Sequence, residues 1–412
     1  MKKIILLLLS TILQFSLFAQ IQIEKKNLSK EIKYLSGDKL GGRSPGSKGE
    51  RKAAKYITSK FSKYGLQARG TDGYYQPFTY KENVTNPHAT DEKGAKKRTG
   101  KNIIAYLDNS AEYTIVIGAH YDHLGHGDHG NSLDPDPKGK IHNGADDNAS
   151  GTAGVIELAR YYAENKVKEN YNFLFICFSA EEAGLIGSKY FTANPTIDLG
   201  KVNCMFNMDM IGRLNDSTKT LLVYGTGTSP EFETWVHDMQ NDNIRVITDS
   251  SGVGPSDHTS FYLKNIPVLH FFSGQHSDYH KPSDDFEKIN LDGEVQILKY
   301  IIRLVDRINE KPKLPFTPTR NPESARTSFK VTLGVMPDYS YTGKGLRIDG
   351  VTDGKPASKA GLKQGDIIIQ LGKTDIDNIK DYTKALGKFE KGEKTVVKWI
   401  RGETAMEAEV TF

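Results

Sequence analysis

The chain contains very little cysteine, with Cys177 and Cys204 as the only two among its 412 residues. Both lie inside apolar runs that are typical of buried strands, so we expect two buried thiols and no disulfide framework. A large excess of charge of one sign is also missing, because the formal net charge at pH 7 is only +4. Since nucleic-acid binding calls for a strongly basic patch, we expect no nucleic-acid partner.

Long apolar runs are missing from the sequence except at the N-terminus. Two lysines are followed there by a mostly apolar stretch, 4–18, and Ala19 precedes a polar segment. The run is shorter than the roughly 20 residues that a membrane-spanning helix needs, although a membrane anchor is the alternative. The pattern is typical of a secretory signal peptide at residues 1–19. We therefore expect a periplasmic or secreted protein without a stable membrane span.

Strand and helix patterns alternate along residues 20–310. The strand-like segments are 102–107, 113–120, 171–180, 202–210, 220–225 and 266–272, and the helix-like segments are 149–165, 230–241 and 290–309. Ser47 and Glu50 have the spacing of a capping box at the start of a further helix, which Gly65 can end. Residues 70–100 are polar and aromatic, and we expect a loop there. The alternation predicts an α/β domain with a largely parallel sheet.

A proline-rich segment separates this domain from a second unit. Residues 311–328 contain four prolines, which excludes a continuous helix and predicts a semi-rigid linker. Residues 329–412 are rich in glycine and in strand-like patterns, with one helix-like stretch at 377–386. We therefore expect a small β-rich domain after the linker.

Residue types that bind metals gather at the ends of the strands of the predicted α/β domain. They are His120, Asp122, His123, His126 and His129 after 113–119, Asp146 and Asp147 at the start of 149–165, Glu181 and Glu182 after 171–180, Asp209 in 202–210, and His276, Asp278 and His280 after 266–272. In open α/β sheets, ligands bind beyond the carboxyl ends of the strands. The candidates are histidines and carboxylates without cysteine, which indicates a catalytic site for zinc or a similar divalent metal.

The segments around these residues resemble a known set of motifs. AHYDHLG, GADDNASG, SAEEAGLIGS, NMDMIGR and DYHKPSD are similar to the motifs of the secreted di-zinc aminopeptidases of metallopeptidase clan MH, leucyl aminopeptidase type. The similarity covers roughly residues 30–310. It implies a mainly parallel mixed sheet sandwiched by helices, and an exopeptidase that removes N-terminal residues from peptides.

The resemblance also implies which residues bind two Zn²⁺ ions per chain. One ion would be held by His120, Asp147 and Asp209, and the other by Asp147, Glu182 and His280. Asp147 would therefore bridge the two ions. The remaining histidines of the first loop have no ligand counterpart in the family and are interpreted as loop residues; they are His123, His126, His129 and His142.

Three further residues receive catalytic roles from the resemblance. Glu181 would be the general base that acts on a metal-bridged water, Asp122 would fix the imidazole of His120, and Tyr279 would donate a hydrogen bond to the oxyanion. Neighbouring side chains of an extended segment point in opposite directions. We therefore expect Glu182 to face the metal and Glu181 to face the substrate.

The C-terminal unit resembles a different family. KVTLGVMPDY at 330–339 and PASKAGLKQGDIIIQLGK at 356–373 are similar to bacterial PDZ domains attached to periplasmic proteases. The resemblance implies that backbone amides around Leu333, Gly334 and Val335 hold the carboxylate of a peptide or protein C-terminus, with the peptide added as a strand beside the predicted helix. The alternative is a domain that only packs and stabilises.

Two other functions remain open at this point. One is another reaction of the same clan, such as that of a carboxypeptidase or a glutaminyl cyclase; the complete ligand set and the bridging Asp147 favour two metals over a single-zinc cyclase. The other is a PDZ-based peptide-binding protein whose metal site is a relic, against which the intact Glu181 argues. The sequence does not indicate the preferred N-terminal residue, the natural substrate or the oligomeric state.

Overall fold

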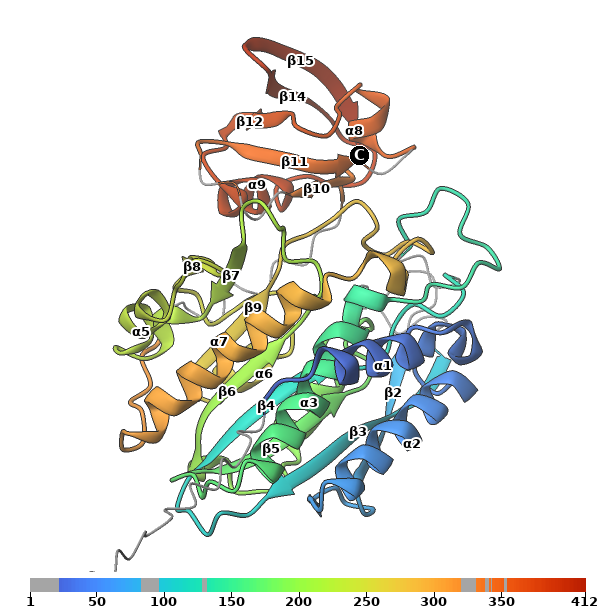
Figure 1. Ribbon diagram of the computed structural model, residues 1–412. Coiled ribbons are helices and arrows are strands. Elements are labelled where there is room, and N and C mark those ends of the chain that lie inside the picture. The colour runs from blue at the N-terminus through green and yellow to red at the C-terminus, as the bar shows by residue number, and fades with distance from the viewer. Residues whose placement is uncertain are drawn as a thin grey trace, which may run out of the picture.

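The computed structural model describes residues 22–82, 96–127, 132–319, 331–337, 341, 343–351 and 354–412. Figure 1 shows a large α/β domain and a small β-rich domain at the C-terminus, and each has its own hydrophobic core. The predicted signal peptide, His129 and the second half of the predicted linker lie outside the described residues. Across the described ranges, every helix is too short or too polar to cross a membrane.

The large domain is built on one mixed sheet. In order across the sheet, its strands are β1 (Gln67–Ala68), β3 (Lys96–Leu107), β5 (Asn172–Phe178), β4 (Thr114–His120), β6 (Val202–Met208), β9 (Val268–Phe272), β7 (Thr220–Tyr224) and β8 (Arg245–Asp249), and β2 (Tyr75–Glu82) pairs with β3. The central strands β5, β4, β6 and β9 are parallel, whereas β3 and β7 join them in antiparallel pairs. The carboxyl ends of the central strands therefore meet at one edge of the sheet.

Helices cover both faces of this sheet (Figure 1). In β4, Ile115 and Ile117 belong to the core on one face and Val116 to the core on the other, because successive side chains of a strand alternate. The first core includes side chains of α1 (Lys25–Leu35), α2 (Lys48–Lys63), α3 (Gly151–Glu164), α5 (Phe232–Asp238) and α7 (Leu291–Asn309), and the second includes those of α4 (Ile186–Ala193) and α6 (His258–Tyr262). The predicted sheet sandwiched by helices is confirmed.

The segment at 70–100 differs from its prediction as a loop. Strand β2 pairs with the first part of β3 in an antiparallel hairpin. Side chains alternate between buried and exposed from Gln76 to Tyr80, as in a strand with one covered face. The prediction was wrong because the polar residues on the exposed side conceal this short alternation.

Helix α2 begins where the sequence predicts. Ser47 Oγ accepts a hydrogen bond from the backbone N of Glu50 at 3.0 Å. The Glu50 carboxylate does not complete the predicted capping box. It accepts hydrogen bonds from the backbone N of Gly46 at 2.7 Å and from the hydroxyl groups of Tyr121 and Ser179. Since Tyr121 and Ser179 lie at the ends of β4 and β5, Glu50 ties the start of α2 to the edge of the sheet.

The first part of the predicted linker is docked on the large domain. Leu314 is buried, and its backbone N donates to Asn203 Oδ1 at 2.7 Å. The backbone N of Thr317 donates to Thr228 O at 2.9 Å. These contacts correct the prediction of a spacer for residues 311–319.

Over its described residues, the small domain is an antiparallel sheet with two helices. Its strands follow the order β10 (Val335–Pro337), β11 (Leu346–Val351), β12 (Ile367–Leu371), β14 (Lys394–Arg401) and β15 (Thr404–Thr411), and β13 (Thr374–Asp375) pairs with β12. The helices are α8 (Pro356–Lys359) and α9 (Ile379–Leu386). Leu333, Ile368 and Trp399 lie in its core.

Candidate metal centre

The candidate site lies at the carboxyl ends of the central strands. His120 is the last residue of β4, Asp209 directly follows β6, and Glu182 lies in a turn after β5. Asp147 lies in the irregular turn before α3, and His280 lies in the loop after β9. The fold thus brings together five separate stretches of chain.

The first group of donor atoms comes from His120, Asp147 and Asp209. His120 Nε2 lies 3.3 Å from Asp147 Oδ1 and 3.2 Å from Asp209 Oδ1. The donor atoms of the three residues lie within 4.8 Å of one another. Ser256 Oγ donates to Asp209 Oδ2 at 2.8 Å, which leaves Oδ1 directed toward the histidine.

The second group shares Asp147 with the first. His280 Nε2 lies 3.2 Å from Asp147 Oδ2 and 3.1 Å from Glu182 Oε2. His123 Nδ1 lies 2.8 Å from Glu182 Oε1, and His123, Asp147 and Glu182 also have donor atoms within 4.8 Å of one another. The two oxygens of Asp147 therefore face different groups, so that this carboxylate stands between them.

This donor set fits divalent cations. Imidazole nitrogens and carboxylate oxygens are the ligands that zinc takes in catalytic sites. Burial disfavours the negative charges of Asp147 and Glu182. The neighbouring histidines nevertheless hold the pKa of Asp147 well below its usual value and the pKa of Glu182 at about 2. The carboxylates in turn raise the pKa of His120 and His280 well above the usual value, against the effect of burial. Neutral imidazoles and ionised carboxylates are the forms that would serve as ligands.

Glu181 lies in a turn, where the sequence predicted an extended segment. Strand β5 ends at Phe178, and Glu181 O accepts from the backbone N of Gly184 at 2.7 Å. The alternation of a strand therefore does not separate the two glutamates, and that part of the prediction was wrong. Burial raises the pKa of Glu181 well above its usual value, with His120 opposing and Asp209 adding to the shift. Glu181 thus interacts with the first group, whereas Glu182 contacts the second.

Asp122 holds the turn that carries both glutamates. Its Oδ1 accepts from the backbone N of Glu181 at 3.1 Å, and its Oδ2 accepts from that of Glu182 at 3.4 Å. The carboxylate lies 3.8 Å from His120 Nδ1, whereas the backbone O of Asp122 lies 3.3 Å from that nitrogen. Asp122 thus orients the imidazole through its backbone and the glutamates through its side chain.

Tyr279 lies against the second group. Its ring stacks on the imidazole of His280, with centroids 3.8 Å apart and planes inclined by 23°. Burial, together with Asp147 and Glu182, raises the pKa of Tyr279 well above its usual value. The hydroxyl group therefore keeps its proton and can donate a hydrogen bond.

Arg43 supports the centre and was missed by the sequence analysis. Its buried guanidinium donates to the backbone O of Tyr121 at 2.8 Å, of Asn143 at 2.7 Å and of Gly144 at 3.0 Å. Burial lowers the pKa of Arg43 to about 10, so it stays charged at neutral pH. Arg43 therefore holds together the two chain segments that carry His120 and Asp147. Its place after two glycines, Gly41 and Gly42, is the one local signal for a tightly packed turn.

Asp284 is the second supporting residue that the sequence analysis missed. Its Oδ2 accepts from the backbone N of Asp146 at 2.9 Å and of Asp147 at 3.1 Å. Asp146, the other carboxylate of the motif, accepts from Ser150, Gly212 and His276 and does not join either group of donor atoms. Asp284 thus fixes the backbone from which Asp147 projects.

The histidines interpreted as loop residues occupy different places. His126 is exposed, and His142 is buried with its Nε2 2.7 Å from Ser132 Oγ. His123 lies in the second group of donor atoms, which the interpretation as a loop residue did not anticipate. The same loop reaches His280, since the backbone N of Leu133 donates to His280 O at 3.0 Å.

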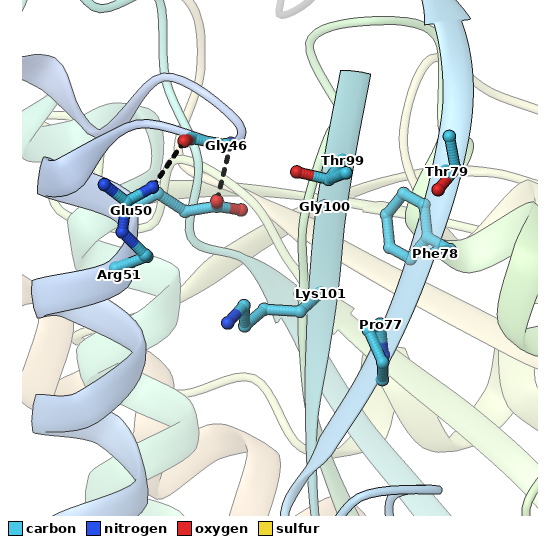
Figure 2. Close-up of a pocket in the computed structure, with 9 residues that line it drawn as sticks. All are labelled: Gly46, Glu50, Arg51, Pro77, Phe78, Thr79, Thr99, Gly100 and Lys101. Atoms are coloured by element: carbon cyan, nitrogen blue, oxygen red, sulfur yellow. Dashed lines mark hydrogen bonds between the residues drawn. The ribbon is translucent and has the colours of Figure 1, made fainter. Parts of the chain in front are cut away.

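A pocket of about 280 Å³ lies between the start of α2 and the β2–β3 hairpin (Figure 2). It is lined by Gly46, Glu50, Arg51, Pro77, Phe78, Thr79, Thr99, Gly100 and Lys101. Figure 2 shows Glu50 and Arg51 hydrogen-bonded to Gly46. The predicted ligands are not among these lining residues, so this pocket is separate from the candidate metal centre.

The residues predicted to bind a carboxylate lie at the start of β10 in the small domain. Leu333 is buried, and its backbone O accepts from Ala357 N at 2.8 Å. Gly334 has a φ of 78°, and its backbone N donates to Thr332 Oγ1 at 3.0 Å. Val335 begins β10 and pairs with Val351 of β11.

Comparisons with known proteins agree with this architecture. Residues 102–305 match the model of peptidase family M28, and residues 323–412 match the model of the PDZ domain. Leupeptin-inactivating enzyme 1 of Streptomyces exfoliatus is 28% identical over 266 residues, which are 64% of this chain and 51% of that protein. A probable leucine aminopeptidase of Arthroderma otae is 25% identical over 224 residues, or 52% of this chain and 58% of its own length. The chain thus spans between half and three fifths of these relatives.

Solved structures share the fold of the large domain. The aminopeptidase from Aneurinibacillus sp. strain AM-1 has a TM-score of 0.55 and 20% identity, over 73% of this chain and 97% of that one. A glutaminyl cyclase of Porphyromonas gingivalis also has a TM-score of 0.55, with 18% identity over 69% of this chain and 98% of that one. At these identities the similarity concerns the fold alone. The two matching models and the geometry above agree on a peptidase family M28 domain that includes residues 102–305, followed by a PDZ domain within residues 323–412.

Proposed function

We propose that this protein is an aminopeptidase that removes N-terminal residues from peptides and uses two zinc ions per chain. The observation that carries the proposal is the position of Asp147, whose Oδ1 lies 3.3 Å from His120 and whose Oδ2 lies 3.2 Å from His280. Relatives with the name leucine aminopeptidase support this reaction class. A free α-amine is a cation, so a site rich in carboxylates favours it over an internal peptide bond.

The side chains around the two groups of donor atoms have different roles in hydrolysis. The bound ions would polarise the scissile carbonyl group and lower the pKa of water. Glu181 takes a proton from the attacking water and passes it to the leaving amine, for which a carboxylate with a raised pKa is suited. The Tyr279 hydroxyl donates to the oxygen on which negative charge develops. Asp122 keeps both glutamates in place through their backbone amides.

The substrate class can be tested with a panel of aminoacyl anilides and their N-acetylated counterparts. We expect hydrolysis of the free amines and at least a hundredfold slower hydrolysis of the acetylated compounds, because acetylation removes the positive charge. Release of ammonia from a peptide with N-terminal glutamine, without hydrolysis, would instead identify a cyclase. Release of C-terminal residues would identify a carboxypeptidase, and inactivity of the metal-loaded protein would support a relic site.

The proposal includes export and a peptide-binding role for the small domain. The predicted signal peptide supports a periplasmic or secreted location. The position of Leu333, Gly334 and Val335 at the start of β10 supports binding of a peptide C-terminus as an added strand beside α9. A peptide held by its C-terminus would meet the metal centre at a raised effective concentration.

Deletion of residues 320–412 should leave the hydrolysis of small aminoacyl anilides nearly unchanged. This expectation follows because the large domain has its own core and its own ligands. For longer peptides with a free carboxyl end, KM should rise by roughly tenfold while kcat changes little, since only binding is lost. Amidation of the peptide C-terminus should have the same effect on the full-length enzyme. Equal cleavage of free and amidated peptides would exclude substrate tethering.

A further inference from the structure

His123 occupies a place that the family ligand set leaves unexplained. It follows the β4 ligand His120 by three residues and is almost completely buried, with 1% of its surface exposed. Its Nδ1 lies 2.8 Å from Glu182 Oε1 and 3.9 Å from Asp147 Oδ2. His123 thus approaches the same two carboxylates that His280 approaches.

The ring of His123 is held by packing. A Cβ atom on Gly144 would lie only 2.5 Å from Cδ2 and 2.6 Å from Cγ of His123, so the imidazole lies directly on the backbone of the turn before Asp147. His123 Nε2 is buried and has no hydrogen-bond partner in the described part of the chain. Since Nδ1 alone has polar partners, the packing directs this nitrogen toward the second group.

The distances around Glu182 are those of ligands that share one cation. Zinc bonds of about 2.0–2.1 Å in tetrahedral geometry place neighbouring donor atoms roughly 3.3 Å apart. The two imidazole nitrogens of the second group lie 2.8, 3.1, 3.2 and 3.9 Å from the carboxylate oxygens. Each oxygen of Glu182 faces a different imidazole, with the bridging carboxylate of Asp147 beside both.

We infer that His123 is a ligand of the second metal ion, through Nδ1, in addition to Asp147, Glu182 and His280. The inference deepens the proposed function and rests on its two-metal centre. The two metal positions then differ in their number of protein ligands, since the first has three and the second has four. Catalytic zinc sites typically keep three protein ligands and an open position. The first position is therefore the more open one, and the second retains its ion more firmly.

The number of metal-bound histidines tests this inference directly in the unaltered protein. The cobalt-loaded full-length chain should show, in its proton NMR spectrum, paramagnetically shifted and exchangeable imidazole N–H signals from three histidines, His120, His123 and His280. Two cobalt ions with signals from only two histidines would overturn the inference and leave the two-metal centre intact. Fewer than two bound ions would instead overturn the proposed centre itself.

Substitution distinguishes a ligand from a residue that only positions Glu182. His123→Gln keeps an N–H donor for Glu182 but removes the imidazole, and His142→Ala is a matched control in the same loop. Loss of a positioning partner typically lowers metal affinity by about 10- to 100-fold, so loss of a ligand should lower the affinity for the second ion by more than about 100-fold. We expect this loss in His123→Gln and unchanged affinity in His142→Ala, measured by competition with a chelator. A loss of about 100-fold or less in His123→Gln would overturn the inference, because a residue that only positions Glu182 accounts for a loss of that size.

Discussion

The Glu181→Gln variant should lose nearly all turnover and keep both metal ions. The amide has the shape of the carboxylate but cannot accept a proton from water, and general-base catalysis contributes about 10²- to 10⁴-fold. Because the base also activates the nucleophile, we expect kcat for an aminoacyl anilide to fall by roughly 10³-fold or more. Elemental analysis of the same samples should show unchanged metal content, since Glu182 and not Glu181 contacts the second group of donor atoms.

The neighbouring variant Glu182→Gln is the matched control. It removes the charge that faces His123 and His280 at 2.8 and 3.1 Å. We therefore expect it to lose or weaken one metal ion, and to regain part of its activity when excess zinc is added. The roles of the two residues would be reversed if Glu182→Gln were inactive with its full metal content and Glu181→Gln lost metal.

Much of the α/β fold could be predicted because both faces of the central strands are covered. The apolar runs of β4, β5 and β6 are continuous for this reason, and they stand out in the sequence. Strand β2 and the first part of β3 form a hairpin with an exposed face, so their pattern is weaker and was missed, whereas residues 102–107 of β3 were predicted as a strand. The position of the candidate site could also be predicted from the sequence. Parallel strands bring their carboxyl ends to one edge of the sheet, so the residues that follow these strands come together there.

The supporting residues could not be predicted because their partners are distant in the sequence. Arg43 reaches the backbone of residues 78 and 101 positions away, Tyr121 and Gly144. No local pattern marks such contacts. His123 was interpreted only as one of several loop histidines for a related reason, because its packing against Gly144 and its position 2.8 Å from Glu182 follow from the tertiary structure. The turn at Glu181 likewise depends on Asp122, which lies on the neighbouring strand end.

Removal of the metal ions should abolish hydrolysis and destabilise the large domain. An ion that binds only the folded state at a free concentration of 1,000 times its Kd stabilises that state by about 4.1 kcal/mol. Calorimetry should therefore show a lower Tm for the large domain after chelation. The transition of the small domain should not move, because its core is separate.

Magnesium should not restore activity, since it prefers oxygen ligands in octahedral geometry. Full activity in a chelated sample that elemental analysis shows to be metal-free would contradict the account.

The most direct test of the two-metal aminopeptidase is a zinc titration of the metal-free protein. Bound zinc and release of the N-terminal residue from a free-amine peptide are measured in the same samples. We predict that activity reaches its plateau at two zinc ions per chain, since the two groups of ligands share Asp147. A plateau at one ion per chain, or no release at any zinc content, would contradict the account.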